Sequence, residues 1–378
     1  MTKPLHGPTF VDLFCGAGGL SLGLKEAGWK PLLAVDHWPD AAATYAANFP
    51  GERVISEDVS TLDEKRLRNL VSQPPDWVVG GPPCQGFSTV GRREPSDPRN
   101  KLVREFARVV QILRPKGFLV ENVLGLRDMR FIGHVCGLFF DLGYEVTPLL
   151  LTAADYGVPQ LRRRVVFVGH SQGRSFLKPK PVKKVDEYVT VWDAIGDLPE
   201  LQPGQKVDAY DRVPFTKYQR RMRQGSRSLQ GHEASDHPAY LVRAISFIPD
   251  GGNRLSIPSP YQPKSGYHNS YSRLHSRSPA VAVTQNMGKP SATRCIHPFQ
   301  NRGLTAREGA RLQGFCDTFH FLGPMCSQRL QIANAVPPIL GAVLGQALRD
   351  PDHWIDRPVA ESQYLLFRDG DSDRFSAA

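Results

Sequence analysis

The stretch Phe10-Val11-Asp12-Leu13-Phe14-Cys15-Gly16-Ala17-Gly18-Gly19-Leu20 decides the fold. It starts as an apolar, strand-like run, passes through closely spaced glycines and enters a helix-like segment over residues 21–27. Glycines at such a turn let the backbone approach a ligand closely. Because Gly16, Gly18 and Gly19 crowd together, the spacing departs from the dinucleotide fingerprint G-x-G-x-x-G. The stretch therefore predicts a nucleotide-type cofactor loop, with an ordinary tight turn as the alternative.

A second strand exit carries a lone cysteine. The sequence Gly80-Gly81-Pro82-Pro83-Cys84-Gln85 follows the apolar run at residues 77–79. Ligands of open α/β sheets bind beyond the carboxyl ends of the strands, and the two prolines restrict the direction of the thiol. We expect Cys84 to be a nucleophile rather than a packing residue, because a structural cysteine usually lies within an apolar run.

Two carboxylates end the next two strand-like runs. Asp36 follows residues 31–35, and Asp58 follows residues 53–55. A carboxylate after the second strand can accept hydrogen bonds from ribose hydroxyls, and one after the third can accept from an adenine amino group. Together they indicate an adenosine-bearing cofactor, although each alone is more typical of a helix N-cap or a turn.

Strand–helix alternation continues to about residue 170, which predicts an α/β fold with a doubly wound sheet. A Lys/Pro-rich hinge follows at residues 177–184, and the chain is then irregular to roughly residue 290. Thr305, with Glu308 three residues later, predicts a capping box at a helix start. A final apolar helix is expected over residues 336–348. The expected division is residues 1–185, residues 186–324, and residues 325–378 returning to the first part.

The ordered motifs resemble those of the bacterial-type C5-cytosine-specific DNA methyltransferases. The matches are residues 12–19 for the S-adenosylmethionine loop, 82–84 for the nucleophile, 121–123 for the catalytic glutamate, 160–164 for Q-x-R-x-R, 307–315 for the late helix motif and 331–338 for the C-terminal motif. Three positions depart from the pattern: Asp36 replaces a commoner glutamate, His37 stands where an aromatic residue often stacks on adenine, and Ala333 replaces a usual glycine. The resemblance implies a Rossmann-like S-adenosylmethionine-dependent domain and, in residues 186–324, a smaller target-recognition domain.

The resemblance also implies a reaction. Cys84 would add covalently to C6 of a cytosine flipped out of double-stranded DNA, which activates C5 for methylation and yields S-adenosylhomocysteine. Glu121 would protonate or hydrogen-bond N3, Arg164 would hold the cytosine O2, and Arg162 would hold a phosphate or Glu121 itself, with Gln160 completing the catalytic set. A solvated basic turn is the alternative for residues 160–164 in isolation. No residue is identified as the base that removes the C5 proton.

Cofactor and DNA contacts follow from the same matches. The expected cofactor contacts are Phe14, Gly16, Gly18, Gly19, Leu20, Asp36, His37, Asp58, Val59, Pro82, Leu102, Asn334, Ala335 and Val336. The expected DNA contacts are Ser88, Arg92 and Arg93 in a loop interpreted as closing on DNA, Arg220, Arg221 and Arg223 in a basic run, and Arg273 in the recognition domain. A solvated face is the alternative for the basic run.

Composition agrees with a polyanionic partner. The chain has 47 Lys and Arg against 37 Asp and Glu, a formal net charge of +10. Six cysteines at irregular spacing lack the pattern of metal ligands, so no metal is expected, and a free Cys84 favours a reducing compartment. No run is long enough to span a membrane, and the N-terminus lacks a signal-peptide pattern. We expect a cytoplasmic, nucleoid-associated monomer.

Several biological settings stay open. The enzyme would belong to a restriction-modification system, with an endonuclease acting on the same site without stable contact, or would act alone. One rival is a tRNA cytosine methyltransferase, although the Cys-Phe-Thr tripeptide of that branch is absent. The other is a catalytically inactive DNA-binding relative, which predicts a broken Pro-Cys, Glu-Asn-Val or Q-x-R-x-R element, and all three are intact.

Overall fold

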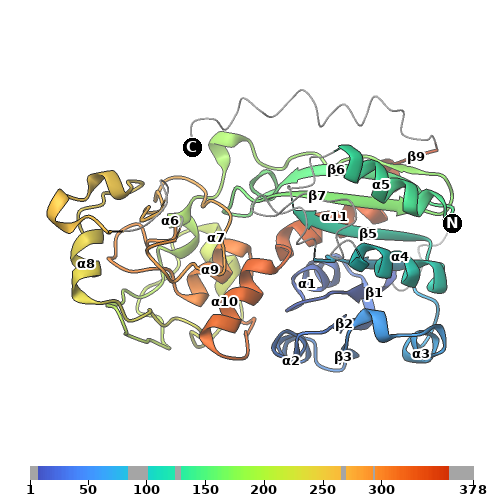
Figure 1. Ribbon diagram of the computed structural model, residues 1–378, viewed down its shortest axis with the longest axis horizontal. Coiled ribbons are helices and arrows are strands. Elements are labelled where there is room, and N and C mark those ends of the chain that lie inside the picture. The colour runs from blue at the N-terminus through green and yellow to red at the C-terminus, as the bar shows by residue number, and fades with distance from the viewer. Residues whose placement is uncertain (1–6, 84–100, 124–128, 265–269, 293, 357–378) are drawn as a thin grey trace.

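A seven-stranded sheet forms the larger lobe of the computed structural model, which describes residues 7–83, 101–123, 129–264, 270–292 and 294–356 (Figure 1). The strand order is β3-β2-β1-β4-β5-β7-β6. The strands are β1 (Thr9–Leu13), β2 (Lys30–Asp36), β3 (Val54–Ser56), β4 (Trp77–Gly80), β5 (Gly117–Val123), β6 (Glu145–Thr152) and β7 (Arg163–His170). All neighbours pair in parallel except β7, which runs antiparallel to both β5 and β6. The predicted doubly wound α/β fold is confirmed.

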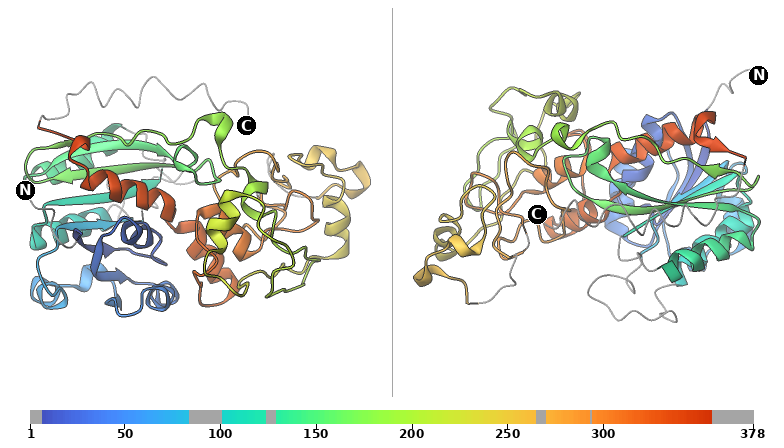
Figure 2. Two further views of the ribbon diagram at one scale, coloured as in Figure 1. Left: turned by 180° about the vertical axis from the view of Figure 1, so that it is seen from behind. Right: turned by 90° about the horizontal axis from the view of Figure 1, so that it is seen from above.

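Helices cover both faces of this sheet (Figure 2). On one face lie α3 (Glu64–Leu70), α4 (Lys101–Leu113) and α5 (Met129–Phe140), and on the other α1 (Gly19–Glu26), α2 (Pro39–Asn48) and α11 (Pro338–Arg349). Alternate strand residues supply the two cores: Val11 and Val78 pack on the first face, Phe10 and Val79 on the second. Strands buried on both sides are typical of a parallel sheet.

The smaller lobe consists of short helices joined by long loops. They are η6 (Val185–Glu187), α6 (Val191–Ile195), α7 (Lys217–Arg223), α8 (Ala239–Ile245), η7 (Arg254–Ser256), η8 (Ser259–Tyr261), α9 (Ala306–Gln313) and α10 (Met325–Asn334). The remaining elements in the described chain are η1 (Val59–Thr61), η5 (Ala153–Tyr156), η9 (Pro351–His353) and the pair β8 (Ser175–Phe176) and β9 (Trp354–Ile355). The capping box of Thr305 and Glu308 at the start of α9 is confirmed.

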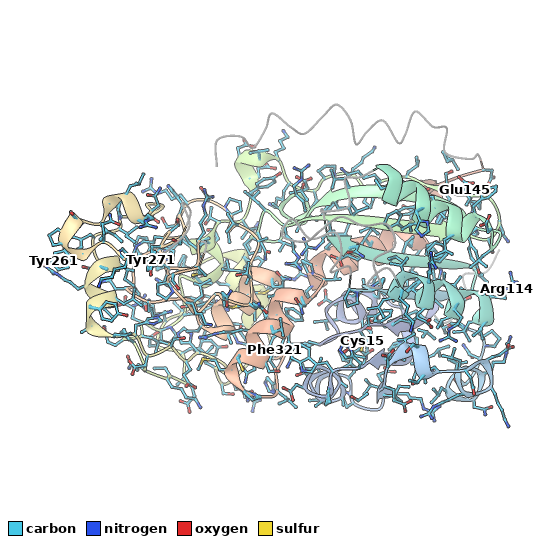
Figure 3. All side chains as sticks on the ribbon, viewed as in Figure 1. Cys15, Arg114, Glu145, Tyr261, Tyr271 and Phe321 are labelled. Carbon is cyan, nitrogen blue, oxygen red and sulfur yellow. The ribbon has the colours of Figure 1, made fainter. Side chains whose placement is uncertain are left out.

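One hydrophobic cluster spans both lobes. Cys15 and Phe49 of the larger lobe belong to the same cluster as Leu312 and Phe315 of the smaller one, and Phe321 packs against it (Figure 3). Polar contacts reinforce the junction, because Asn48 Nδ2 donates to the His320 carbonyl at 2.8 Å while Asn48 Oδ1 accepts from the His320 amide at 2.9 Å. The smaller lobe is therefore packed on the larger lobe rather than tethered by a linker. No helix in the described part of the chain is long and apolar enough to cross a membrane.

Close packing of α1 on α11 generates a stability prediction. A Cβ atom on Gly23 would lie 2.2 Å from the Pro338 carbonyl oxygen and 2.5 Å from the Ala342 amide nitrogen. We expect Gly23→Ala to destabilise the protein by about 2 kcal/mol, because the two helices must separate. Gly137→Ala is the matched control in α5, where no described atom lies within 4 Å of the added Cβ. It should stabilise by about 0.5–1 kcal/mol through helix propensity. Urea unfolding of both variants checks the opposite signs.

A buried polar cluster lies within the smaller lobe. Arg302 donates to both carboxylate oxygens of Glu308, at 2.9 and 2.6 Å. Burial opposes ionisation of Glu308, but the Arg302 guanidinium holds the pKa of this carboxyl well below its usual range. His297 Nε2 lies 3.8 Å from Glu308, and His297 Nδ1 accepts from the amides of Phe299 and Gln300. His297 is thus held as a neutral imidazole with its proton on Nε2.

This cluster predicts acid sensitivity. Burial lowers the pKa of His297 from 6.5 to about 3; Glu308 opposes that shift, and Arg302, Arg273 and His232 add to it. Because the unfolded chain binds the proton first, the free energy of unfolding should fall as pH drops from about 6.5 towards 3, by about 1.4 kcal/mol per pH unit for this group. Urea unfolding between pH 7.5 and 5 should show a shallower slope for His297→Asn. An identical slope in that variant would contradict the assignment.

Candidate active site

The exit of β4 and the end of β5 lie side by side at the carboxyl edge of the sheet. Asn122 Nδ2 donates to the Pro82 carbonyl at 3.1 Å, and a Cβ on Gly81 would lie 3.4 Å from Glu121 Oε2. Glu121 therefore stands beside the segment that leads to Cys84. Cys84, Ser88, Arg92 and Arg93 themselves lie outside the described residues. The role of Asn122 in fixing this exit was not predicted, although an amide within a buried strand is a signal for such a contact.

Glu121 and Arg164 form a buried ion pair. Arg164 Nε lies 2.8 Å from Glu121 Oε1, and the two side chains are only 12% and 9% exposed. Antiparallel pairing explains the contact: Glu121 is opposite Val166, which puts Arg164 at a diagonal position on the same face. Neither Glu121 Oε1 nor Arg164 Nε has a well-aligned hydrogen-bond partner among the described residues. The contact between these two atoms is therefore mainly electrostatic.

Arg162 points along the same face but contacts another element. Its Nη2 donates to the Ala333 carbonyl at 2.9 Å, and its Nε has no hydrogen-bond partner in the described chain. Burial lowers the pKa of Arg162 to about 9, and the neighbouring positive charge of Arg164 adds to the shift. Burial also lowers the pKa of Arg164, against the opposing charge of Glu121. Arg164, rather than Arg162, is the partner of Glu121 in this structure.

Gln160 is fully buried and its amide is saturated. Nε2 donates to the Leu312 carbonyl at 3.0 Å and to Gln313 Oε1 at 2.7 Å, and Oε1 accepts from the Val283 amide at 3.0 Å. These contacts leave no free donor or acceptor facing the Glu121–Arg164 pair. Its geometry favours positioning of the following arginines over contact with a reacting atom.

The predicted cofactor loop has the required backbone. Phe14 and Gly16 have positive φ values of 57° and 53°, and no described atom lies within 4 Å of a Cβ built on Gly16. Gly18 is also left-handed, with φ 94°. A Cβ on Gly19 would lie 2.3 Å from the Val336 carbonyl, so this glycine permits the close approach of the C-terminal motif. The space beside Gly16 fits a bound ligand.

Asp36 and Asp58, the two predicted cofactor-binding acids, differ in exposure and in the hydrogen bonds they already accept. Asp36 is nearly buried and accepts from the Gly16 amide at 2.8 Å and the Trp38 amide at 2.9 Å, which ties the end of β2 to the glycine loop. Each of its oxygens keeps a further lone pair. Asp58 is exposed and caps η1 by accepting from the Ser60 amide, and this hydrogen bond lowers its pKa. His37 is exposed, with its Nδ1 3.6 Å from Asp36 Oδ1.

The other expected cofactor residues divide by exposure. Asn334 is exposed at the end of α10 and Leu102 is half-buried in α4. The buried members are Leu20, Val59, Pro82, Ala335 and Val336. Phe14, Asp36 and Asp58 thus lie at the carboxyl ends of β1, β2 and β3, and Asn334 lies one residue before the Ala335–Val336 segment that packs on Gly19.

Sequence inspection missed the support behind the glycine loop. Ser21 Oγ donates to Asp12 Oδ2 at 2.6 Å, and Tyr45 Oη donates to Ser21 Oγ at 3.1 Å. Burial raises the pKa of Asp12 to about 7, although the Ser21 hydrogen bond opposes the shift. A carboxylate inside the apolar run of β1 was the available signal. The network fixes the first turn of α1 against β1.

The expected DNA contacts have different outcomes. Arg273 is buried, and its guanidinium donates to the carbonyls of Ile245, Ile248, His297 and Gln300 and to Asn301 Oδ1. The expectation that Arg273 contacts DNA is therefore replaced by a structural role, because its donors are used within the lobe. Arg220 is exposed, whereas Arg221 lies 3.2 Å from Glu26 of α1, and Arg223 stacks 3.7 Å over the Tyr210 ring.

The part of the chain that the structure describes contains no cluster of candidate metal ligands. No three His, Cys, Asp or Glu side chains there come together as metal ligands.

The buried ion pair generates a stability prediction. Glu121→Ala leaves the Arg164 guanidinium buried beside Arg162 without its counter-charge, so we expect a loss of about 3–5 kcal/mol in the free energy of unfolding. Replacing both partners, in Glu121→Ala/Arg164→Met, should recover most of that loss. Urea unfolding of the single and double variants measures the difference. A double variant no more stable than Glu121→Ala would contradict the pairing.

Comparison with known proteins identifies the family. Residues 8–349 match the family described as C-5 cytosine-specific DNA methylase. The chain is 41% identical over 347 residues to the type II methyltransferase M1.HphI of Haemophilus parahaemolyticus, covering 90% of this chain and 86% of the relative. It is 39% identical to M.DdeI of Desulfomicrobium norvegicum, covering 89% and 88%.

Solved structures agree with this assignment. A candidate DNA modification methyltransferase encoded within an Escherichia coli prophage superposes with a TM-score of 0.73 and 28% identity, covering 90% of this chain and 98% of that one. The Dnmt2 methyltransferase of S. pombe, at 18% identity and a TM-score of 0.55, shares the fold alone. Six ordered motifs, a doubly wound sheet and a match over most of the chain lead to one conclusion: this protein belongs to the C5-cytosine-specific DNA methyltransferases.

Proposed function

We propose that Cys84 is the nucleophile of a reaction that methylates C5 of a cytosine flipped out of double-stranded DNA. The observation that carries this proposal is the buried Glu121–Arg164 pair beside the exit of β4. S-adenosylmethionine, the methyl donor of this family, supplies a methyl group on a cationic sulfur. The family is one of DNA methyltransferases, which favours DNA over tRNA as the substrate.

Each step of cytosine methylation can be assigned to a residue of this chain. C5 of cytosine is a weak nucleophile, so the Cys84 thiolate first adds at C6 and raises the electron density at C5. Negative charge then develops at N3 and O2 of the ring. For this step Glu121 must carry a proton, which it donates to N3 as it parts from Arg164, while the Arg164 guanidinium stabilises O2. Burial of both groups strengthens these contacts, because water does not screen them. Once C5 has taken up the methyl group, loss of the C5 proton to a base expels the Cys84 thiolate, and N3 returns its proton to Glu121.

In this proposal, Arg162 and Gln160 do not contact the reacting atoms. Arg162 is held by the Ala333 carbonyl and adds positive potential beside Arg164. That potential favours the thiolate of a nearby cysteine. Gln160 sets the start of β7 through three hydrogen bonds.

The cofactor is assigned to the carboxyl ends of β1 to β4. Gly16 and Gly18 give the backbone access, and Gly19 lets the Val336 segment close the loop. Asp36 keeps lone pairs for the ribose hydroxyls, and exposed Asp58 is free to accept from the adenine amino group. Exposed His37 covers the adenine, with Phe14, Leu20, Val59, Pro82, Leu102, Asn334, Ala335 and Val336 completing the cradle.

The biological setting is proposed from the relatives. Type II methyltransferases are the named relatives, so we place the enzyme in a restriction-modification system, as a monomer acting at the nucleoid in the cytoplasm. Its endonuclease would read the same site without binding this chain. We assign residues 1–185 to catalysis, 186–324 to target recognition and 325–378 to closing the catalytic lobe. In α7, we assign phosphate binding first to Arg220 and then to Arg221 and Arg223. In the segment that follows Cys84 in the sequence, we assign DNA contacts to Ser88, Arg92 and Arg93.

The decisive test is transfer of tritium from labelled S-adenosylmethionine to unmethylated duplex DNA, with bisulfite sequencing of the product. Cys84→Ser should lower transfer by roughly 1,000-fold or more, because no other group replaces the nucleophile. Cys326→Ser, at an exposed position, is the matched control and should retain full activity. Label in tRNA but not in DNA would support the tRNA alternative. Unchanged transfer by Cys84→Ser would overturn the mechanism.

A further inference from the structure

A buried glutamine bridge connects the two halves of the site. Gln313, the last residue of α9, is fully buried. Its Nε2 donates to the Ala335 carbonyl at 2.5 Å, and its Oε1 accepts from Gln160 Nε2 at 2.7 Å. One amide thus binds the residue after Asn334 and the glutamine two residues before Arg162.

A second contact repeats the connection. Arg162 Nη2 donates to the Ala333 carbonyl at 2.9 Å. The carbonyls on both sides of Asn334 therefore accept from side chains that belong to, or are held by, the Q-x-R-x-R segment. Carbonyls at a helix C-terminus need partners from outside the helix, and here α10 ends at Asn334. Asn334 itself stays exposed.

We propose that Gln313 is a positioning residue that sets the turn carrying Asn334 and the segment carrying Arg162 and Arg164 at a fixed separation. The target-base half and the cofactor half of the site then share one support. The proposal rests on the cofactor role proposed above for Asn334. Only a glutamine-length amide supplies both a donor and an acceptor across this gap, because glutamate has no donor and asparagine is one methylene shorter.

A purely structural role predicts different behaviour. Loss of buried hydrogen bonds lowers stability wherever it occurs. Gln219 is the matched control, because it is also fully buried and its amide makes three hydrogen bonds, to Trp192, Phe215 and Thr216 in the smaller lobe, against two for Gln313. Gln219→Met should lower the melting temperature without changing cofactor affinity.

The experiment compares Gln313→Met, Gln160→Met and Gln219→Met. Calorimetry without DNA measures the Kd for S-adenosylhomocysteine, and single-turnover assays at saturating DNA measure methyl transfer. We expect Gln313→Met to weaken S-adenosylhomocysteine binding about tenfold and slow transfer about tenfold. Gln160→Met should slow transfer but keep the Kd within twofold. Gln219→Met should keep both within twofold.

Two outcomes overturn the proposal. The first is a folded Gln313→Met whose Kd and transfer rate match those of Gln219→Met. If Gln313→Met does not fold, an unchanged transfer rate in Gln160→Met overturns the proposal instead. The second comes from Asn334→Ala, which separates this inference from its basis. If Asn334→Ala weakens S-adenosylhomocysteine binding and Gln313→Met does not, the positioning role of Gln313 is wrong while the cofactor role of Asn334 stands. If Asn334→Ala binds S-adenosylhomocysteine normally, both the cofactor role of Asn334 and the positioning role of Gln313 are wrong.

Discussion

The reversed direction of β7 is the constraint on which the site depends. In a sheet of parallel strands, only carboxyl ends reach the functional edge, and each is followed by a loop. Because β7 runs antiparallel between β5 and β6, its amino end reaches that edge as well. Arg164 then projects from regular strand geometry beside Glu121, where paired residues of β5 and β6 on both sides fix its direction. Arg162 lies directly before the strand. A charged pair can be held this precisely because it sits on strands rather than on loops.

Packing extends this order to the smaller lobe. The cluster that contains Cys15 and Phe49 continues into Leu312 and Phe315, so no solvent-filled hinge separates the lobes there. Buried charges complete the attachment, because Arg311 of α9 contacts both Asp197 and Asp317 with none of the three side chains exposed. Removing one such partner is costly, since the remaining charge stays buried. Helix α9 is therefore held in the smaller lobe by buried charge as well as by apolar packing.

Sequence patterns revealed those features that depend on local chain chemistry. The strands before Cys84, Asp36 and Asp58, the glycine loop and the capping box of Thr305 all lie in short contiguous stretches. The pattern failed where distant backbone determines a side chain's environment. Arg273 looks like any exposed arginine in an irregular segment, yet carbonyls from residues 245–248 and 297–300 surround it. The partner of Arg162, some 170 residues away, was equally invisible, because no periodicity reports a contact between β7 and α10.

The position of α11 has a consequence for synthesis of the protein. This helix covers one face of the sheet by packing on α1, and Trp29 Nε1 donates to the Gly345 carbonyl across 316 residues. A nascent chain can pair β1 to β7 soon after they leave the ribosome, but Leu20 and Leu24 stay uncovered until residues 338–349 emerge. Translation that stops short of that helix leaves an apolar surface exposed to chaperones and proteases. This face of the sheet is therefore covered only once residues 338–349 have been translated.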